Sequence, residues 1–111
     1  MANISVTITS NRELIEQASD EAIARALEAI GLQAEGYAKM KCPVDTGNLR
    51  NSITHTTDVD EKAAYIGSNV EYAAYVEYGT QKTKAQPYLK PAVVNHVDEY
   101  RQLAEYYLKN G

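Results

Sequence analysis

Apolar residues occupy every second position near the amino terminus, and polar residues fill the positions between them. A period of two is typical of a strand with one buried face, because successive side chains of a strand point to opposite sides. We therefore predict a strand over residues 3–9. Ser10 follows, three positions before Glu13, at the spacing of a capping box in which each side chain bonds the other's backbone amide. We expect a helix to begin there.

Over residues 14–38 the apolar residues recur at steps of three and four, which is the spacing of one helix face. The pattern predicts one long amphipathic helix that Pro43 stops. Many of its apolar positions are Ala, so a neighbouring element can approach closely while burying little area per residue. Gly31 and Gly36 weaken its second half, each by up to about 1 kcal/mol relative to Ala.

Two β-prone runs follow, residues 52–57 and 63–68, separated by the charged stretch 58–62. This order predicts an antiparallel hairpin with a solvated acidic tip. A short helix is expected over residues 70–78, ending at Gly79, which suits the left-handed conformation past a helix terminus.

Residues 80–86 are polar apart from Ala85, and we predict a mobile loop that becomes ordered when it docks on a partner. From Pro87 the helical spacing returns and predicts one terminal helix, with His96 on its solvated side. The expected fold is a single α+β domain over residues 1–111, a small and mainly antiparallel sheet packed against a long N-terminal helix and a C-terminal helix.

Nine Tyr and neither Phe nor Trp make up the aromatic content. Tyr combines a large apolar ring with a hydroxyl that prefers a partner, so it suits both cores and subunit interfaces. For any single Tyr both interpretations stay open, and only the clustering favours an interface.

Fifteen acidic residues against eleven basic ones give a net charge of −4, which argues against tight binding to a phosphate backbone. The lone Cys42 cannot form an internal disulfide, and nowhere do 18 apolar residues follow one another as in a membrane span. These features predict a protein that is cytosolic when it is made.

Cys42 and His55, completed by Asp45 or Asp58, suggest a thiol nucleophile with its base. A lone Cys beside a helix end is more often a small buried hydrophobe, and we favour that interpretation. The His and Cys positions lack the spacing of a zinc site, and the acidic stretch lacks the pattern of a calcium loop. We expect no catalytic site, no metal and no cofactor.

Three short motifs are more specific than their surroundings. They are Pro-Val-Asp-Thr-Gly-Asn-Leu-Arg-Asn-Ser-Ile at 43–53, Ala-Ala-Tyr-Val-Glu-Tyr-Gly-Thr at 73–80 and Pro-Tyr-Leu-Lys-Pro-Ala at 87–92. In the first motif Leu49 and Ile53 are expected to anchor a turn to the core. Arg50 is then left able to pair with a carboxylate such as Asp45, or with a neighbouring subunit.

In this order, and after an amphipathic helix, the motifs resemble the gene-product-ten-like tail-component family of tailed bacteriophages, whose members are described as neck or tail-completion proteins. The resemblance spans roughly residues 11–100. It implies a non-enzymatic subunit of the head-to-tail junction that forms a ring through which the genome passes. It also implies other neck and tail proteins as partners, no membrane, and a place in the virion after synthesis in the host cytoplasm.

Tyr72, Tyr75 and Val76 are spaced to share one side of the short helix, where a Tyr-rich patch could anchor a neighbouring subunit. Simple packing of this helix on the sheet is the competing interpretation. The full set of candidate interface residues is Asp45, Arg50, Tyr72, Tyr75, Val76, Tyr78, Lys82, Lys84 and Tyr88.

We expect a six-fold homo-oligomeric ring. The alternative is a stand-alone dimeric adaptor or inhibitor, and stoichiometry separates the two because a connector must match the symmetry of its phage partners.

Overall fold

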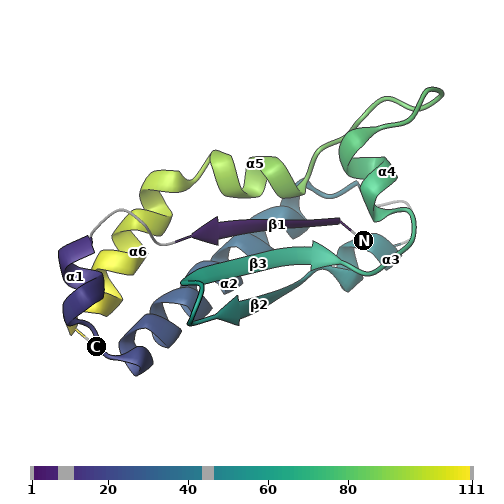
Figure 1. The fold of residues 1–111 in the computed structure, drawn as a ribbon. Coiled ribbons are helices and arrows are strands. Elements are labelled where there is room, and N and C mark those ends of the chain that lie inside the picture. Colours follow the sequence, from purple (N-terminus) through teal and green to yellow (C-terminus); the bar gives the residue numbers. More distant parts are fainter. Residues whose placement is uncertain (1, 8–11, 44–46, 111) are drawn as a thin grey trace.

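The computed structural model describes residues 2–7, 12–43 and 47–110. The described part of the chain forms an elongated body of 49 × 20 × 19 Å in which helices cover one side of a small sheet (Figure 1). Along the chain the elements are β1 (Ala2–Thr7), α1 (Arg12–Gln17), α2 (Asp20–Lys41), α3 (Asn48–Ser52), β2 (Thr54–Asp58), β3 (Ala63–Ser68), α4 (Ala73–Tyr78), α5 (Leu89–Val94) and α6 (Val97–Asn110).

The sheet has the order β1-β3-β2 with both pairs antiparallel, so the predicted hairpin is confirmed and β3 is the central strand. Ile66 of β3 stands opposite Ile4 on one side and His55 on the other. The predicted first strand is confirmed over Ala2–Thr7, whereas its last two positions and the capping serine Ser10 lie outside the described residues.

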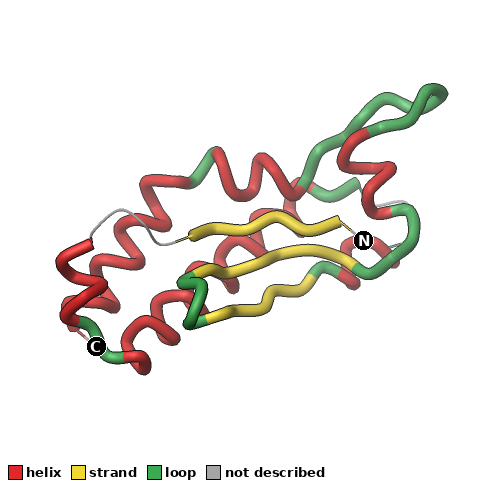
Figure 2. The backbone as a smooth tube through the Cα atoms, viewed as in Figure 1, coloured by secondary structure: helices red, strands yellow, loops and turns green. Residues whose placement is uncertain are grey.

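Helix α2 lies behind the sheet and packs on β2 and β3, while α5 and α6 run along the β1 side (Figure 2). The expected α+β arrangement of a long helix, an antiparallel sheet and a C-terminal helix is therefore confirmed. The face of α2 that meets the core is rich in alanine. Its buried residues are Ala22, Ile23, Ala26, Leu27, Ile30, Gly31, Ala34 and Ala38.

The long helix itself is confirmed as α2, but the prediction that it runs unbroken from residue 14 is wrong, because the chain breaks between α1 and α2. Ser19 adopts an extended conformation, and its hydroxyl accepts a hydrogen bond of 3.1 Å from the amide of Ala22. A serine at this position satisfies an amide that the helix itself cannot, and so favours a new helix start over continuation. At the other end α2 stops at Lys41, before Pro43, as predicted.

The single terminal helix is also divided, into α5 and α6. The β-branched run around Val93 and Val94 and the following Asn95 are weak helix formers, and the amide of His96 bonds the carbonyl of Val93, three residues back. The turn brings the His96 ring onto Tyr37 of α2, with ring centroids 3.6 Å apart and planes 5° apart. The expectation that His96 lies on a solvated helix face is therefore wrong.

Helix α3 takes the place of the turn expected in the first motif. Leu49 and Ile53 are buried, as predicted. The hydroxyl of Ser52 donates to the carbonyl of Leu49, and it shares a hydrogen bond with Ser68 at the end of β3. The first motif thus fixes the end of the sheet at which the hairpin enters and leaves.

His55 joins β2 to α2 through both of its ring nitrogens. Nδ1 lies 2.8 Å from a carboxylate oxygen of Glu35, and Nε2 lies 2.7 Å from one of Glu28. A Cβ atom on Gly31 would come within 2.8 Å of the His55 ring, so glycine at this position lets the imidazole lie flat on the helix. Lys39 extends the cluster with a 3.2 Å bond to Glu35.

Burial opposes the charged forms of both groups, but their hydrogen bonds outweigh it. Burial lowers the pKa of His55, whereas the bonds to Glu28 and Glu35 raise it, and the net pKa lies above 6.5. For Glu35, burial raises the pKa, whereas the bonds to His55 and Lys39 lower it, and the net pKa lies below 4.5. The ionised cluster therefore stabilises the packing of α2 on β2.

A second polar group is buried at the carboxyl end of α4. Glu77 is only 4% exposed, and its two carboxylate oxygens accept hydrogen bonds from the amides of Tyr88, Leu89 and Lys90 at 2.9, 2.8 and 3.1 Å. These amides open α5 and have no partner within that helix. Glu77 of the second motif thus holds the third motif in place.

Stability should depend on pH through the His55 cluster. The raised pKa of His55 means that its contribution is complete below about 6.5 and is lost as pH rises through the folded pKa, and the lowered pKa of Glu35 means that its contribution is lost below about 4.5. The urea midpoint should therefore be highest between these values and fall towards pH 9. In His55→Gln the fall above pH 6.5 should flatten, and an unchanged slope would contradict the assignment.

Replacing Glu77 by Ala should destabilise the fold by about 3 kcal/mol, because three buried amides lose their acceptor. Urea denaturation measures the loss. Glu71→Ala is the matched control, since Glu71 is exposed and its removal should change the free energy of unfolding by less than about 0.5 kcal/mol. Equal effects of the two variants would show that the hydrogen bonds from the α5 amides to Glu77 do not stabilise the fold.

Candidate functional site

The short helix α4 turns its tyrosines outward. Ala73 and Glu77 face the core, whereas Tyr72, Tyr75 and Tyr78 are 41, 61 and 69% exposed, and we call these three the tyrosine patch. Val76, predicted to share one side with two of the tyrosines, is instead partly buried against the core. The three tyrosines are thus accessible to a partner and Val76 is largely covered within the subunit, and their place in an interface stays a prediction.

Residues 80–86 form an arm that projects from the body beyond α4 (Figure 1). Its base is closed by a 2.8 Å bond from the amide of Gln86 to the carbonyl of Val76, and by one of the same length from the amide of Thr80 to the carbonyl of Thr83. Gly79, with φ of +79°, makes the tight exit from α4, and a Cβ there would lie 2.7 Å from the amide nitrogen of Ala85. That the arm is mobile and orders on docking stays a prediction.

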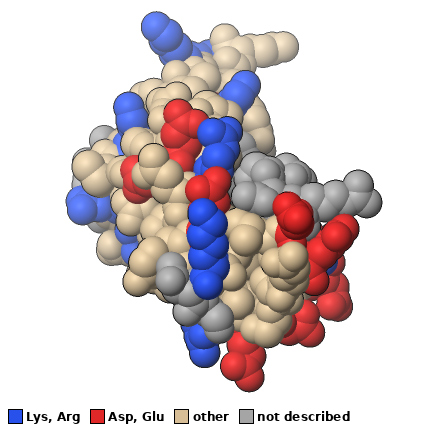
Figure 3. Space-filling model, turned by 90° about the vertical axis from the view of Figure 1, so that its left-hand side faces the viewer, with Lys and Arg blue, Asp and Glu red and all other residues tan. Residues whose placement is uncertain are grey.

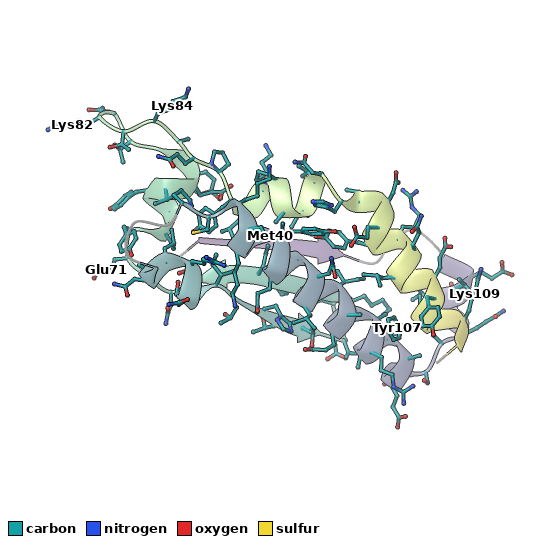
Figure 4. The ribbon with its side chains drawn as sticks, turned by 180° about the vertical axis from the view of Figure 1, so that it is seen from behind. Met40, Glu71, Lys82, Lys84, Tyr107 and Lys109 are labelled. Carbon is teal, nitrogen blue, oxygen red and sulfur yellow. The ribbon has the colours of Figure 1, made fainter. Side chains whose placement is uncertain are left out.

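Lys82 and Lys84 are exposed on the arm and point away from the body (Figure 4). Arg50 is exposed on α3, while Asp45, its predicted partner, lies outside the described residues. These cations lie at one end of the long axis, together with the tyrosine patch.

Tyr88 is fully buried, so counting it among the surface candidates was wrong for this subunit. Its hydroxyl donates a 3.2 Å hydrogen bond to the carbonyl of Ala73, and its amide donates to Glu77. Tyr100 is a second core tyrosine, with its hydroxyl on the carbonyl of Ala92. Both side chains fill the space where α5 and α6 meet the rest of the fold.

The sheet face opposite α2 carries a groove of about 300 Å³ that the sequence did not reveal. We call it the sheet groove, and its lining includes Ser52, Thr54, Thr56, Tyr65, Gly67 and Asn69. Thr54 pairs with Gly67 and Thr56 with Tyr65, so the hollow lies where β3 presents a glycine instead of a side chain. Only the strand register brings these residues together.

Charge is distributed unevenly along the molecule. Figure 3 looks onto the end formed by α1, the start of α2 and the β2–β3 turn, and shows acidic side chains gathered along one flank, with a column of basic side chains beside them. The acidic residues of these segments are Glu13, Glu16, Asp20, Glu21, Asp58, Asp60 and Glu61. The opposite end, around the arm, carries Lys39, Lys41, Arg50, Lys82, Lys84 and Lys90.

The structure keeps Cys42 and His55 in separate surroundings. Cys42 is buried past the end of α2 with its thiol on the carbonyl of Pro43, and burial raises its pKa against the opposing charge of Arg50. Both ring nitrogens of His55 are taken up by glutamates. Within the described ranges, no group of three His, Cys, Asp or Glu side chains could hold a metal ion. No described helix is long and apolar enough to cross a bilayer.

Comparison with known proteins agrees with the resemblance noted in the sequence. The family described as "Bacteriophage HK97-gp10, putative tail-component" matches residues 6–79, which run from β1 to the glycine after α4 and include the first motif and all but the last residue of the second. No curated protein and no solved structure matches the chain. A tail-component family implies a place in the virion and contact with other tail proteins. The match covers well over half of the 111 residues, and the chain belongs to the HK97-gp10-like family of bacteriophage tail components.

Proposed function

We propose that this tail component assembles into a six-fold homo-oligomeric ring at the head-to-tail junction, as a neck or tail-completion protein between the capsid connector and the tail tube. The genome passes through the ring without sequence-specific contacts. The observation that carries the proposal is the tyrosine patch, three exposed aromatic side chains beside a projecting arm.

An exposed cluster of this kind is unusual in a chain that also buries tyrosine well. Tyr88 and Tyr100 show that the core accepts the phenol ring when a carbonyl is near, whereas the tyrosine patch stays in solvent. Tyr is enriched at binding hot spots because it covers a large apolar area with little loss of conformational entropy. The patch therefore supports a role in binding another protein.

The different ends of the molecule support a ring over a symmetric pair. A two-fold dimer joins identical surfaces, whereas a ring joins two unlike surfaces of successive copies. Here the two ends of the 49 Å axis differ, since most of the acidic residues lie at one end and the arm lysines at the other, so the molecule offers unlike surfaces for a contact of the second kind. The overall charge of −4 further suits a lumen through which DNA slides, because few phosphates would be neutralised.

The ring is tested by measuring the mass of the purified protein, alone and with its portal-side and tail-tube partners, and by imaging neck complexes from virions. We expect one closed stoichiometry matching the six-fold tail, formed alone or only with a partner. A protein that is a dimer under both conditions, and absent from virions, would be an adaptor or inhibitor instead.

Tyr75→Ala should impair assembly far more than folding. Tyr75 is 61% exposed, so its loss should change the free energy of unfolding by no more than about 0.5 kcal/mol, while assembly should weaken at least tenfold. Tyr106→Ala is the matched control, because Tyr106 is 60% exposed on α6 at the other end of the molecule. Analytical ultracentrifugation and urea denaturation separate the two effects, and a folding defect without an assembly defect would assign Tyr75 to the core.

A further inference from the structure

Helix α2 contains two glycines, and only one is explained by contacts within the chain. Gly31 lies under the His55 ring, where a Cβ atom would collide. At Gly36 a Cβ atom would meet nothing within 4 Å, and the position is exposed and regularly helical. Because glycine weakens a helix interior relative to alanine, Gly36 makes α2 less stable, and no contact within the subunit requires glycine at this position. Glycine would be required there if the backbone of another molecule came close to the helix.

The residues one turn before and after Gly36 point to the same conclusion. Leu32 is 59% exposed and Met40 is 79% exposed, and together with Gly36 they form a line along the outer face of α2 that we call the helix stripe. Buried Ile30, Ala34 and Ala38 mark the opposite face of the helix, so the stripe points away from the sheet (Figure 4). Two apolar side chains with a gap between them form a surface that can receive a ridge.

The other broad face of the molecule has the complementary shape. The sheet groove opens on the side of the sheet away from α2, with Gly67 in its lining and the methyl groups of Thr54 and Thr56 beside it. Its volume of about 300 Å³ accommodates an apolar side chain as long as that of Met40, and methionine adapts readily to irregular hollows. Thr54 and Thr56 supply hydroxyls at the border of the groove, where water or a partner's backbone can bond.

Charges beside the two surfaces are also opposite. Lys41 is exposed next to Met40 on the helix side. On the sheet side, exposed Glu61 accepts a 2.7 Å bond from the hydroxyl of Tyr65, a residue of the groove, and exposed Glu71 follows Asn69 two positions later. Front and back of the molecule therefore differ in shape, and Lys41 can pair with Glu61 or Glu71 across the contact, while Glu28, one turn before Leu32, and Lys62, beside Glu61, carry the reverse charges.

We propose that the helix stripe of one copy packs into the sheet groove of the next copy, so that neighbours stack front to back around the ring. This inference rests on the proposed ring and names the contact that builds it. Gly36 lets the outer strand β2 of the neighbour approach the helix, and Met40 enters the hollow at Gly67. Since stripe and groove lie on opposite faces of one subunit, the contact is between unlike surfaces and repeats from copy to copy, and it closes into a ring when the rotation between neighbours divides a full turn.

The first experiment changes Gly36 to Ala and measures folding and assembly separately. The melting temperature of the isolated subunit should rise by about 3–5 °C, because the helix gains propensity and nothing in the chain is displaced. Ring formation should weaken about tenfold or more, because the added methyl group holds the neighbour away. Gln102→Ala, at an exposed position of α6, is the control and should leave assembly unchanged. Unchanged assembly in Gly36→Ala would overturn the inference.

The second experiment joins the two faces covalently. Met40→Cys with Thr56→Cys places thiols on opposite faces of each subunit, so a disulfide between them can form only between copies. Under mild oxidation the double variant should give a ladder of linked copies, while either single variant and the parent, whose Cys42 is buried, should stay unlinked. Dimers from Met40→Cys alone would show back-to-back pairing and overturn the front-to-back contact.

The parent protein distinguishes the two levels of the proposal. Rings of the parent without a ladder from the double variant would refute the contact and leave the ring standing. Absence of rings from the parent, with its phage partners present, would refute the ring itself.

Discussion

The close approach of α2 to the sheet is the constraint on which the other elements depend. A helix can lie this near to β2 and β3 only because its inner face is made of small residues, with Ala26, Ala34 and Ala38 completely buried. Small side chains bury little area each, so apolar contact alone gives this layer modest stability. The hydrogen bonds of His55 to two glutamates of α2 also hold the edge strand β2 on the helix, and Gly31 leaves the space for the imidazole ring.

A buried carboxylate joins the second motif to the third. Glu77 lies one residue before the end of α4. Its carboxylate accepts hydrogen bonds from the first amides of α5, the helix that begins after the arm. The arm is therefore held from both sides by a buried interaction, while its own residues need no contact with the core. Tyr88 packs beside this carboxylate, which explains why a tyrosine in the middle of a surface-like motif is the largest fully buried side chain among the described residues.

Periodicity was sufficient to predict the hairpin, the first strand and the course of α2, because those features follow from alternation and from three- and four-residue steps. It missed the breaks at Ser19 and at Asn95, where a local hydrogen bond competes with a helix that the apolar pattern would continue. The exposed tyrosines of α4 were anticipated from clustering, but Tyr88 was misplaced, since its burial depends on Glu77 and on Ala73 far away in sequence. The sheet groove could not be foreseen, because it exists only when Thr54 and Gly67 come into register.

The closed base of the arm separates the sequence of its tip from the stability of the domain. The hydrogen bonds between Val76 and Gln86 and between Thr80 and Thr83 hold the two ends of the arm together at its base. Lengthening a loop whose ends are already held costs little conformational entropy. Insertions or replacements around Lys82 would disturb only the local turn that Thr80 makes with Lys82 and Thr83, so they should cost the domain little stability. The arm is the part of this subunit that selection could change to fit a different tail while the rest of the domain stays as it is.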